Sequence, residues 1–394
     1  MKVISKGRGN KLMGAAFLMA TSAVGPGFIT QTMVFTQQLM LSFGFAILVS
    51  IIVDLLVQWN IWRAVVLSGN SAPSLANKVT PGAGVLLTAL VAVGGLIFNI
   101  GNVAGAGLGL QAATGLPQDI AAGLSGLLAM GIFTARHFGK LLDATVTWLG
   151  LLMLVLLLAT AMATQPPVGA MLFQTIVPEQ VDAKAILTLV GGTVGGYISF
   201  AGAHRYLSLQ DNTTGSILKL HNTATLGIVL SGLVRVLLYA AIVGVLISGF
   251  VPNAANPVAS LFKQAWGHGG GIIFGIILWC AALTSILGAS FTSITFLSAI
   301  IPQIHKRKPL ATVVFIAIST LLYLFIGQPV QVLVWAGTLN GLVLPVGLAF
   351  MLLAAKKLGL LKPGQYATWL WWAGWVCVLL MTGLATSTIL NFTV

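Results

Sequence analysis

The chain is organised as long hydrophobic runs separated by short stretches rich in glycine, proline and charged residues. The runs fall at 12–39, 41–67, 84–113, 117–135, 142–163, 185–209, 220–249, 271–299, 310–326, 330–355 and 367–391. Their lengths suit helices that cross a ~30 Å hydrocarbon layer, which takes about 20 residues, and exceed the short alternating segments of a membrane barrel. Because backbone groups in lipid must pair within their own segment, the pattern predicts an all-α integral membrane protein with about eleven transmembrane helices.

The composition supports this class of protein. Of 394 residues, 58% are apolar and only 6% are charged, and the mean hydropathy is +1.02. This is far more apolar than a water-facing globular surface, so soluble enzyme classes are excluded. The two cysteines, Cys280 and Cys377, each lie inside an apolar run, which favours neither a disulfide framework nor a thiolate metal cluster.

The basic residues predict the orientation of the chain in the membrane. The net charge is +13. If the eleven spans alternate sides, 16 of the 19 lysines and arginines fall on one side, Lys184 and Lys263 fall on the other, and Arg235 lies within a span. Positive charge concentrates on the cytoplasmic side. We therefore expect a plasma-membrane protein with a cytoplasmic N-terminus, an extracellular or periplasmic C-terminus and no nucleic-acid partner.

Two spans are interrupted in corresponding positions. The first contains Gly25-Pro26-Gly27 near its middle, and the sixth, five spans later, is rich in glycine between Gly191 and Gly202. Such residues break a helix by removing a backbone donor or by permitting non-helical dihedral angles. Paired interruptions indicate an inverted-repeat transporter with its site near the bilayer midplane. The alternative is that the glycines only allow close packing between helices.

The same stretches resemble the NRAMP family of divalent-metal transporters. The resemblance rests on 25–28 and 202–204, which are similar to the Asp-Pro-Gly-Asn and Met-Pro-His segments of the family, and on 58–69, 105–110 and 288–295. It implies a LeuT-type fold with five plus five inverted spans. The repeats would cover 1–163 and 185–355, with an extracellular loop at 164–184 and an additional span in 356–394.

The departures from the family pattern change the expected substrate. Where the resemblance puts the metal-binding Asp, Asn and Met, this sequence has Gly25, Phe28 and Gly202, and the acidic pair of the third span corresponds to Asn99 and Asn102. A divalent cation needs anionic or soft ligands in number. The start of a half-helix instead suits a carboxylate. We expect a small carboxylate or amino-acid-like solute. The alternative is transport of Mg²⁺, Mn²⁺ or Fe²⁺, with proton coupling.

Candidate site residues follow from the two interruptions and from the resemblance. For substrate binding they are Gly25, Gly27, Phe28, Thr30, Gln31, Ser199, Gly202, His204 and Asn340; for coupling to H⁺ or Na⁺ they are His204, Asn99, Asn102, Ser290, Thr292 and Ser293. For His204, the alternative is a neutral ring that satisfies backbone groups freed by the break. For the hydroxyls, the alternative is a hydrogen bond to their own helix.

Two charges lie deep inside predicted spans. Asp54 and Arg235 fall near the middle of the second and seventh spans, where a lone charge is expensive. We expect them to form a buried pair, directly or through water; the alternative is that each faces its own water-filled cavity. The sequence has no nucleotide-binding motif and no catalytic constellation. It therefore favours a gradient-driven transporter without a cofactor over an enzyme, keeps a channel as an alternative, and leaves the oligomeric state open, with a monomer as one option.

Overall fold

A computed structural model of the chain describes residues 24–134, 152–209 and 217–392, and every regular element within these ranges is helical. In the first half the helices are α2 (Pro26–Leu39), the 3-10 turn η1 (Met40–Ser42), α3 (Phe43–Ser68), α4 (Ala72–Val79), α5 (Ala83–Thr114) and α6 (Gln118–Thr134). A helix at Leu152–Thr164 follows and is bent by 108° from α8 (Val168–Ile176).

The described residues of the second half form eight further helices. They are α9 (Ala183–Thr193), α10 (Ile198–Leu209), α11 (Ile217–Ile247), α12 (Pro257–Ser298), α13 (Pro302–Lys306), α14 (Lys308–Ile326), α15 (Pro329–Lys357) and α16 (Thr368–Phe392). Each of the eleven predicted hydrophobic runs overlaps a helix of the structure. Among the described residues, eight helices are long and apolar enough to cross a membrane, or nine if the bent pair is one span.

Two features explain why eight or nine long helices correspond to eleven runs. The stretch Pro26–Ser68 counts once but contains α2 and α3, which cover parts of two runs, and α6 is apolar but only 17 residues long. The run at 271–299 starts later than its helix, because α12 continues back to Pro257 through a kink at Trp266 and Gly267. Part of the predicted connection at 250–270 is therefore helical.

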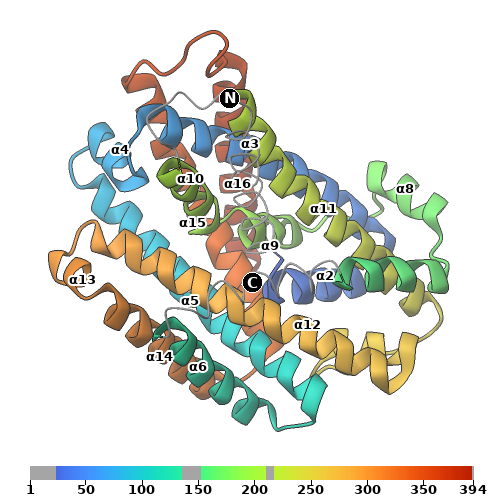
Figure 1. Ribbon diagram of the computed structural model, residues 1–394. Coiled ribbons are helices and arrows are strands. Elements are labelled where there is room, and N and C mark those ends of the chain that lie inside the picture. The colour runs from blue at the N-terminus through green and yellow to red at the C-terminus, as the bar shows by residue number, and fades with distance from the viewer. Residues whose placement is uncertain (1–23, 135–151, 210–216, 393–394) are drawn as a thin grey trace, which may run out of the picture.

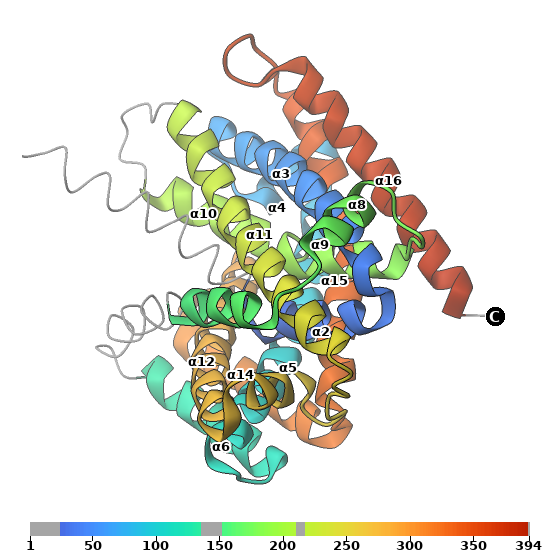
Figure 2. The ribbon, with the colours of Figure 1, turned by 90° about the vertical axis from the view of Figure 1, so that its right-hand side faces the viewer.

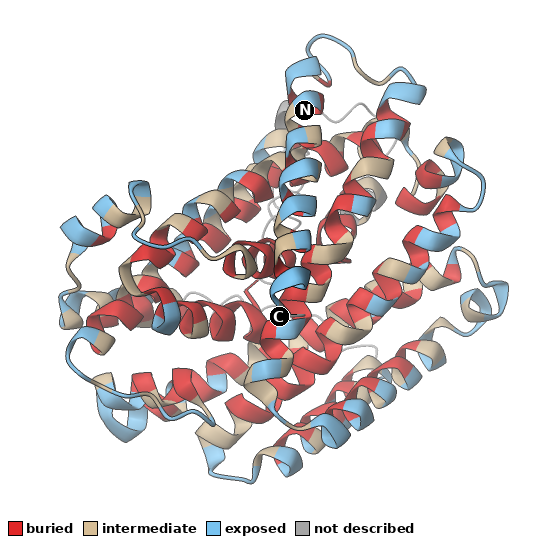
Figure 3. Cartoon of the chain, turned by 180° about the vertical axis from the view of Figure 1, so that it is seen from behind, coloured by how far each residue is buried: buried red, intermediate tan, exposed pale blue. Residues whose placement is uncertain are grey.

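The surface of the molecule is suited to lipid. Many large apolar side chains on several helices are exposed, and Met162, Phe325 and Leu379 are more than two-thirds exposed; such extensive apolar exposure marks a membrane-facing surface. In Figure 3 the buried positions gather on the inner faces of the helices. Inside, α5 packs along α12, and α9 packs against α15. In both Figure 1 and Figure 2, α2 and α9 lie in the middle of the bundle.

The interruption in the sixth span is a short turn between two helices. Helix α9 ends at Thr193 and α10 begins at Ile198, and Gly196 between them has φ +53°, a left-handed conformation that glycine adopts without steric cost. Of the first interruption, the structure describes the side that starts α2: Gly25 is the N-cap and Pro26 the first helical residue. The preceding half of that run lies outside the described residues.

Candidate functional site

The start of α2 is surrounded by polar side chains from neighbouring helices. A Cβ atom added at Gly25 would lie 3.0 Å from Ser285 Oγ of α12 and 3.7 Å from Asn102 Oδ1 of α5. Both polar side chains are buried, and neither Ser285 Oγ nor the Asn102 amide atoms have a hydrogen-bond partner within the described residues. Because Gly105 has no side chain, α5 comes against the ring of Pro26. Glycines on both sides thus hold this helix start deep in the bundle.

Backbone donors point out of the same helix start. Pro26 has no N–H, and the N–H groups of Gly27 and Phe28 lie in the first turn, where an α-helix offers no intrahelical acceptor. These groups and the positive end of the helix dipole together favour a negatively charged ligand. No acidic residue lies in the first turn of α2. The start of α2 therefore presents partial positive charge that no acidic residue of its own first turn offsets.

The predicted charged residues approach this helix start. Arg235 of α11 lies over the ring of Phe28, with its guanidinium carbon 4.0 Å from the ring centroid. Asp54 of α3 is close enough for the two charges to act on each other. Even so, both Asp54 carboxylate oxygens and the Nε and Nη2 atoms of Arg235 are buried without a hydrogen-bond partner in the described structure. The two charges are neighbours, but they are not joined directly.

The break between α9 and α10 carries a second group of polar atoms. Asn340 of α15 donates from Nδ2 to the carbonyls of Gly94 (3.1 Å) and Ala336 (2.8 Å), while its Oδ1 lies against Gly196 and has no partner among the residues described. Ser199 donates to the carbonyl of Val194 across the break (2.9 Å). Asn340 thus lies at the break between α9 and α10, whereas the Ser199 hydroxyl is used to satisfy the backbone.

Gln31 links α2 to the helices around it. Its Nε2 donates to the carbonyl of Leu333 (2.9 Å), and its Oε1 is buried beside Gly192 of α9, with no partner in the part of the chain that the structure describes. Gly27 lies on the same side of α2, because a Cβ there would be 3.4 Å from Gln31 Nε2. Thr30 is buried on α2 as well. The predicted residues of the first break therefore lie within three turns of one helix and face several partners.

The structure differs from the expectation at Gly202 and His204. Both residues are helical in α10, beyond the break. Gly202 packs against the Trp62 ring: an added Cβ would lie 2.6 Å from its Cζ2 atom. His204 Nε2 accepts from the backbone N–H of Ala72 (3.0 Å), and the ring stacks on Phe296. An accepting Nε2 belongs to a neutral ring. The ring thus satisfies a backbone group, as in the alternative, but this group starts α4 and is not one freed by the break.

The two asparagines of α5 are in different surroundings. Asn99 Nδ2 donates to Ser319 Oγ of α14 (2.8 Å), and its Oδ1 is buried with no partner in the described ranges. Asn102 lies near Gly25 and near the hydroxyl of Tyr197, which follows the left-handed glycine of the break. Asn102 is thus positioned between the two breaks, whereas Asn99 faces away toward α14.

The hydroxyls of α12 also separate into two groups. Ser290 donates to the carbonyl of Ile286 within its own helix (2.7 Å), and Ser293 packs against Gly95 of α5. Thr292 is only half-buried on the same helix. The α12 hydroxyl that reaches the start of α2 is Ser285, which sequence reasoning missed. The sequence did carry one indication of Ser285. It lies five residues before Ser290, about one and a half turns nearer the N-terminal end of α12.

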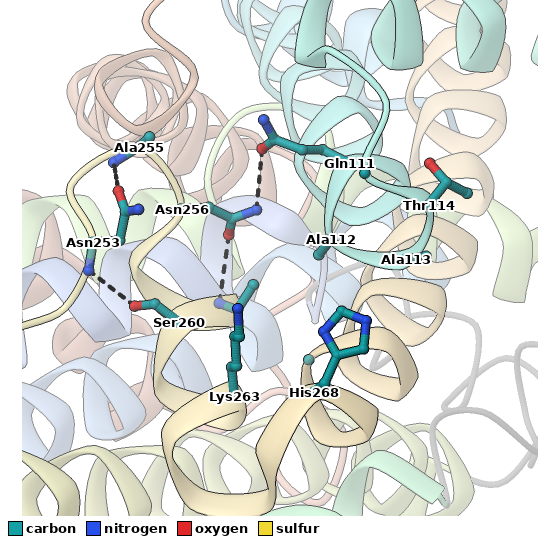
Figure 4. A pocket seen from close by; sticks show the side chains of 13 residues that line it. Gln111, Ala112, Ala113, Thr114, Asn253, Ala255, Asn256, Ser260, Lys263 and His268 are labelled. Atoms are coloured by element: carbon teal, nitrogen blue, oxygen red, sulfur yellow. Dashed lines mark hydrogen bonds between the residues drawn. The ribbon is translucent and has the colours of Figure 1, made fainter.

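A separate cavity opens at one end of the bundle. It has a volume of about 430 Å³ and lies between the end of α5 and the beginning of α12. Polar groups of Gln111, Asn253 and Asn256 line it together with Lys263 and His268 (Figure 4). Asn256 caps α12 by accepting from Ala259 N–H (3.4 Å) and donates to Leu108 O (3.0 Å). Among the described residues that line this cavity, one is a lysine and none is acidic.

The described residues contain no group of three or more His, Cys, Asp or Glu side chains that could hold a metal ion. The polar groups that they place around the helix starts are amides, hydroxyls, backbone groups, the Arg235 guanidinium and a single carboxylate, that of Asp54. Such a set is rich in hydrogen-bond donors and poor in the anionic oxygens and sulfurs that divalent cations require.

Comparisons with known proteins identify relatives along almost the whole chain. The family model described as natural resistance-associated macrophage protein-like matches residues 16–391. An uncharacterized membrane protein of Haemophilus influenzae is 43% identical over 385 residues, covering 98% of this chain and 97% of its own length. The membrane protein YcsG of Bacillus subtilis is 44% identical over 378 residues, covering 96% and 94%.

Solved structures with the same fold are more distant in sequence. The manganese transporter of Eremococcus coleocola, solved with an aromatic bis-isothiourea substituted compound, matches with a TM-score of 0.73 at 17% identity, covering 99% of this chain and 88% of that one. MhsT in complex with L-phenylalanine matches with a TM-score of 0.65 at 16% identity, covering 95% and 98%. These similarities establish the helical architecture expected from the sequence.

Proposed function

The chain belongs to the natural resistance-associated macrophage protein (NRAMP) family of membrane transporters, and from that premise we propose that it carries a small organic carboxylate or amino-acid-like solute. The solute would bind at the start of α2, next to the break between α9 and α10. The observation that carries this proposal is the α2 helix start itself: first-turn N–H groups without intrahelical acceptors, ringed by buried polar side chains that have no partner among the described residues.

The chemistry of the donors favours an anion over a divalent cation. At Gly25 the neighbouring polar groups are Ser285 and Asn102, a hydroxyl and an amide, both of which can donate to a carboxylate. A helix start attracts negative charge, and broken helices in transporters use this end to bind substrate carboxylates. Gly25, Phe28 and Gly202 supply no side-chain metal ligand where the resemblance implies three.

The fold is compatible with either class of cargo. Among solved structures with this architecture, one is named a manganese transporter and another is a complex with L-phenylalanine. Architecture alone therefore does not select the substrate. The selection rests on the side chains at the breaks, and in this chain they are mostly neutral donors.

The second candidate function is transport of Mg²⁺, Mn²⁺ or Fe²⁺. One observation favours it: Asp54 is buried beside Thr193 at the end of α9, and its carboxylate is not paired directly with Arg235. A hydrated Mg²⁺ keeps several waters and needs only one or two carboxylates. However, the positive charge of Arg235 acts on the same carboxylate and opposes a cation there.

Transport would proceed by alternating access, with the helices that carry the breaks moving against the rest. The moving and fixed parts would come from the two repeats at 1–163 and 185–355, together with the loop at 164–184 and the added span in 356–394. A gradient of H⁺ or Na⁺, or of the solute itself, would drive uptake. Of the groups expected to take part in coupling, Asn99, Asn102 and Ser293 keep buried polar atoms without a partner among the described residues. His204 and Ser290 are already hydrogen-bonded. The chain would act in the plasma membrane with its N-terminus in the cytoplasm.

A thermal-shift screen of the purified protein tests the substrate class. Propionate, lactate and L-alanine are compared with MnCl₂ and MgCl₂ at matched ionic strength. A ligand that binds only the folded state raises the melting temperature as its concentration exceeds the Kd. We expect stabilisation by at least one organic acid and none by either metal at low millimolar concentration. Stabilisation by Mn²⁺ or Mg²⁺ with none by any organic acid would replace this proposal with the second candidate.

A further inference from the structure

Arg235 occupies an unusual position for a charged residue. It lies near the middle of α11, within the membrane-spanning stretch Leu220–Ile247. Its side chain is 1% exposed. A charge at such depth is costly unless it has a partner, and it marks a site of ligand or ion movement by default. The burial of Arg235 therefore requires a polar or charged partner, either in the protein or in a bound ligand.

The face of the Arg235 guanidinium packs on an aromatic ring, and one of its edges makes no hydrogen bond to the described residues. It lies over the ring of Phe28, 4.0 Å from the centroid, and an aromatic face attracts a guanidinium without using its N–H groups. The Nε and Nη2 atoms are buried and make no hydrogen bond to the described residues. Nε–H and one terminal N–H lie along a single edge of the planar group, where they form two parallel donors that fit the two oxygens of a carboxylate.

Asp54 does not form a hydrogen bond with this edge of the guanidinium. Its two carboxylate oxygens have no hydrogen-bond partner in the described structure either, although its charge acts on Arg235. The carboxylate and the guanidinium are near enough to balance each other's charge. Because they are not in contact, the hydrogen-bonding atoms of both remain available. Many other buried polar side chains, such as Thr32 and Ser290, bond to a carbonyl of their own helix. The Nε–Nη2 edge of Arg235 instead has no partner among the described residues, while the guanidinium packs on the ring of Phe28 from the first turn of α2.

We propose that Arg235 binds the carboxylate of the transported solute through its Nε–Nη2 edge and is the residue that determines specificity for an acid. This inference rests on the proposed function and names the side chain that binds the carboxylate. Phe28 supplies the platform that orients the guanidinium. The first-turn N–H groups of α2 supply further donors for the same oxygens. Asp54 offsets the charge of Arg235 when the site is empty. A solute that has an amide in place of the carboxylate gains little from this edge.

The test compares a carboxylate with its neutral isostere on three proteins. Isothermal titration of the full-length chain in detergent uses propionate and propionamide as probes. Arg235→Lys keeps the positive charge near Asp54 but removes the parallel donors, since an ammonium group cannot form the bidentate contact. The matched control is Arg63→Lys. Arg63 lies in α3 and bonds to Gln365 O and to His221, away from the helix start.

The wild-type chain and R63K are expected to bind propionate with affinities within about twofold of each other and to bind propionamide at least roughly tenfold more weakly. R235K is expected to bind propionate about tenfold to hundredfold more weakly than the wild type, the loss of one charge-assisted hydrogen bond. If R235K binds propionate as the wild type does, Arg235 has only a structural role beside Asp54, and the proposed function survives. If no organic acid binds the wild type and Mn²⁺ does, the proposed function itself falls.

A second measurement covers the case in which R235K does not fold. The chain has six arginines, so arginine labelled with ¹⁵N gives few Nε–H signals. Arg235 is 1% exposed, so its signal is expected to exchange slowly with solvent. Propionate should shift that signal and leave the other five unchanged, whereas propionamide should shift none. A buried signal that does not move while propionate binds would overturn the assignment.

Discussion

Placing a carboxylate at Gly25 is a sharp test of whether the α2 helix start receives an anion. A Cβ at this position would lie 3.0 Å from Ser285 Oγ, so we would make the substitutions in a Ser285→Ala background, which removes that contact. In this background Gly25→Asp adds a negative charge and Gly25→Asn adds the same shape without the charge. The comparison between the two variants isolates the electrostatic effect.

The magnitude follows from the geometry of the helix. Positions 25 and 28 are three residues apart, which puts their Cβ atoms about 5–6 Å from each other on a helix, and the solute carboxylate is expected beside Phe28. Two like charges at this separation repel by about 3 kcal/mol at an effective dielectric constant of about 20. This corresponds to roughly a hundredfold loss of affinity. If the introduced carboxylate paired with Arg235 instead, it would block the site and lower the affinity in the same direction.

Titration of propionate into the two double variants measures the effect. We expect Gly25→Asp to bind about a hundredfold more weakly than Gly25→Asn, and the difference to shrink only modestly with salt because the site is buried. Affinities for propionate that agree within about threefold in the two variants would refute the idea that the start of α2 is an anion site. A gain of Mn²⁺ binding by Gly25→Asn would also contradict it, because asparagine adds no charge.

Three further predictions concern the Asp54–Arg235 pair, Lys263 in the end cavity and the buried Tyr366. Asp54→Asn leaves the buried Arg235 without its opposite charge and should lower the stability measured by denaturant unfolding by about 3–5 kcal/mol; adding Arg235→Gln should recover part of this loss, and no recovery would mean that the two charges are independent. Lys263→Gln at the end cavity should raise the KM for an anionic solute about threefold in low salt, leave kcat unchanged and have no effect in about 0.5 M salt; an unchanged KM in low salt would exclude Lys263 from attracting the solute. Tyr366 lies between α15 and α16 and donates to Asn60 Oδ1 (2.6 Å), and burial raises its pKa, so its contribution to stability is present below about pH 10 and is lost as pH rises above that value. Tyr366→Phe should flatten this fall in the unfolding midpoint, and an unchanged fall would assign it to another group.

The helical architecture was predictable because it depends on local patterns. A run of about 20 apolar residues forms a helix in lipid wherever it occurs, and each predicted run overlaps one. The second break and the start of α2 were predictable for the same reason, since the glycines around Gly196 and the Gly25-Pro26 pair act on their own backbone. The limits of the second break were less accessible, because Gly202 is helical where it packs against Trp62 of another helix.

The site was only partly predictable because its contacts join distant parts of the chain. Composition identified Arg235 and Asp54 as costly charges, but nothing in the sequence indicates that Arg235 lies on Phe28 of a distant helix. Ser285 resembles any helical serine until the close approach of Gly25 is known. His204 was selected for its chemistry, whereas its Nε2 accepts from Ala72 at the start of α4. Such pairings arise from packing and have no local signal.

The most direct measurement is diffraction from crystals of the wild-type chain grown with both MnCl₂ and sodium propionate, with data collected at the manganese absorption edge. Density for propionate between the Nε–Nη2 edge of Arg235 and the first turn of α2, with no anomalous peak there, is the result we expect. An anomalous peak at the start of α2 or beside Asp54, coordinated directly by oxygens of the protein, would contradict a carboxylate site and identify the cargo as a metal ion.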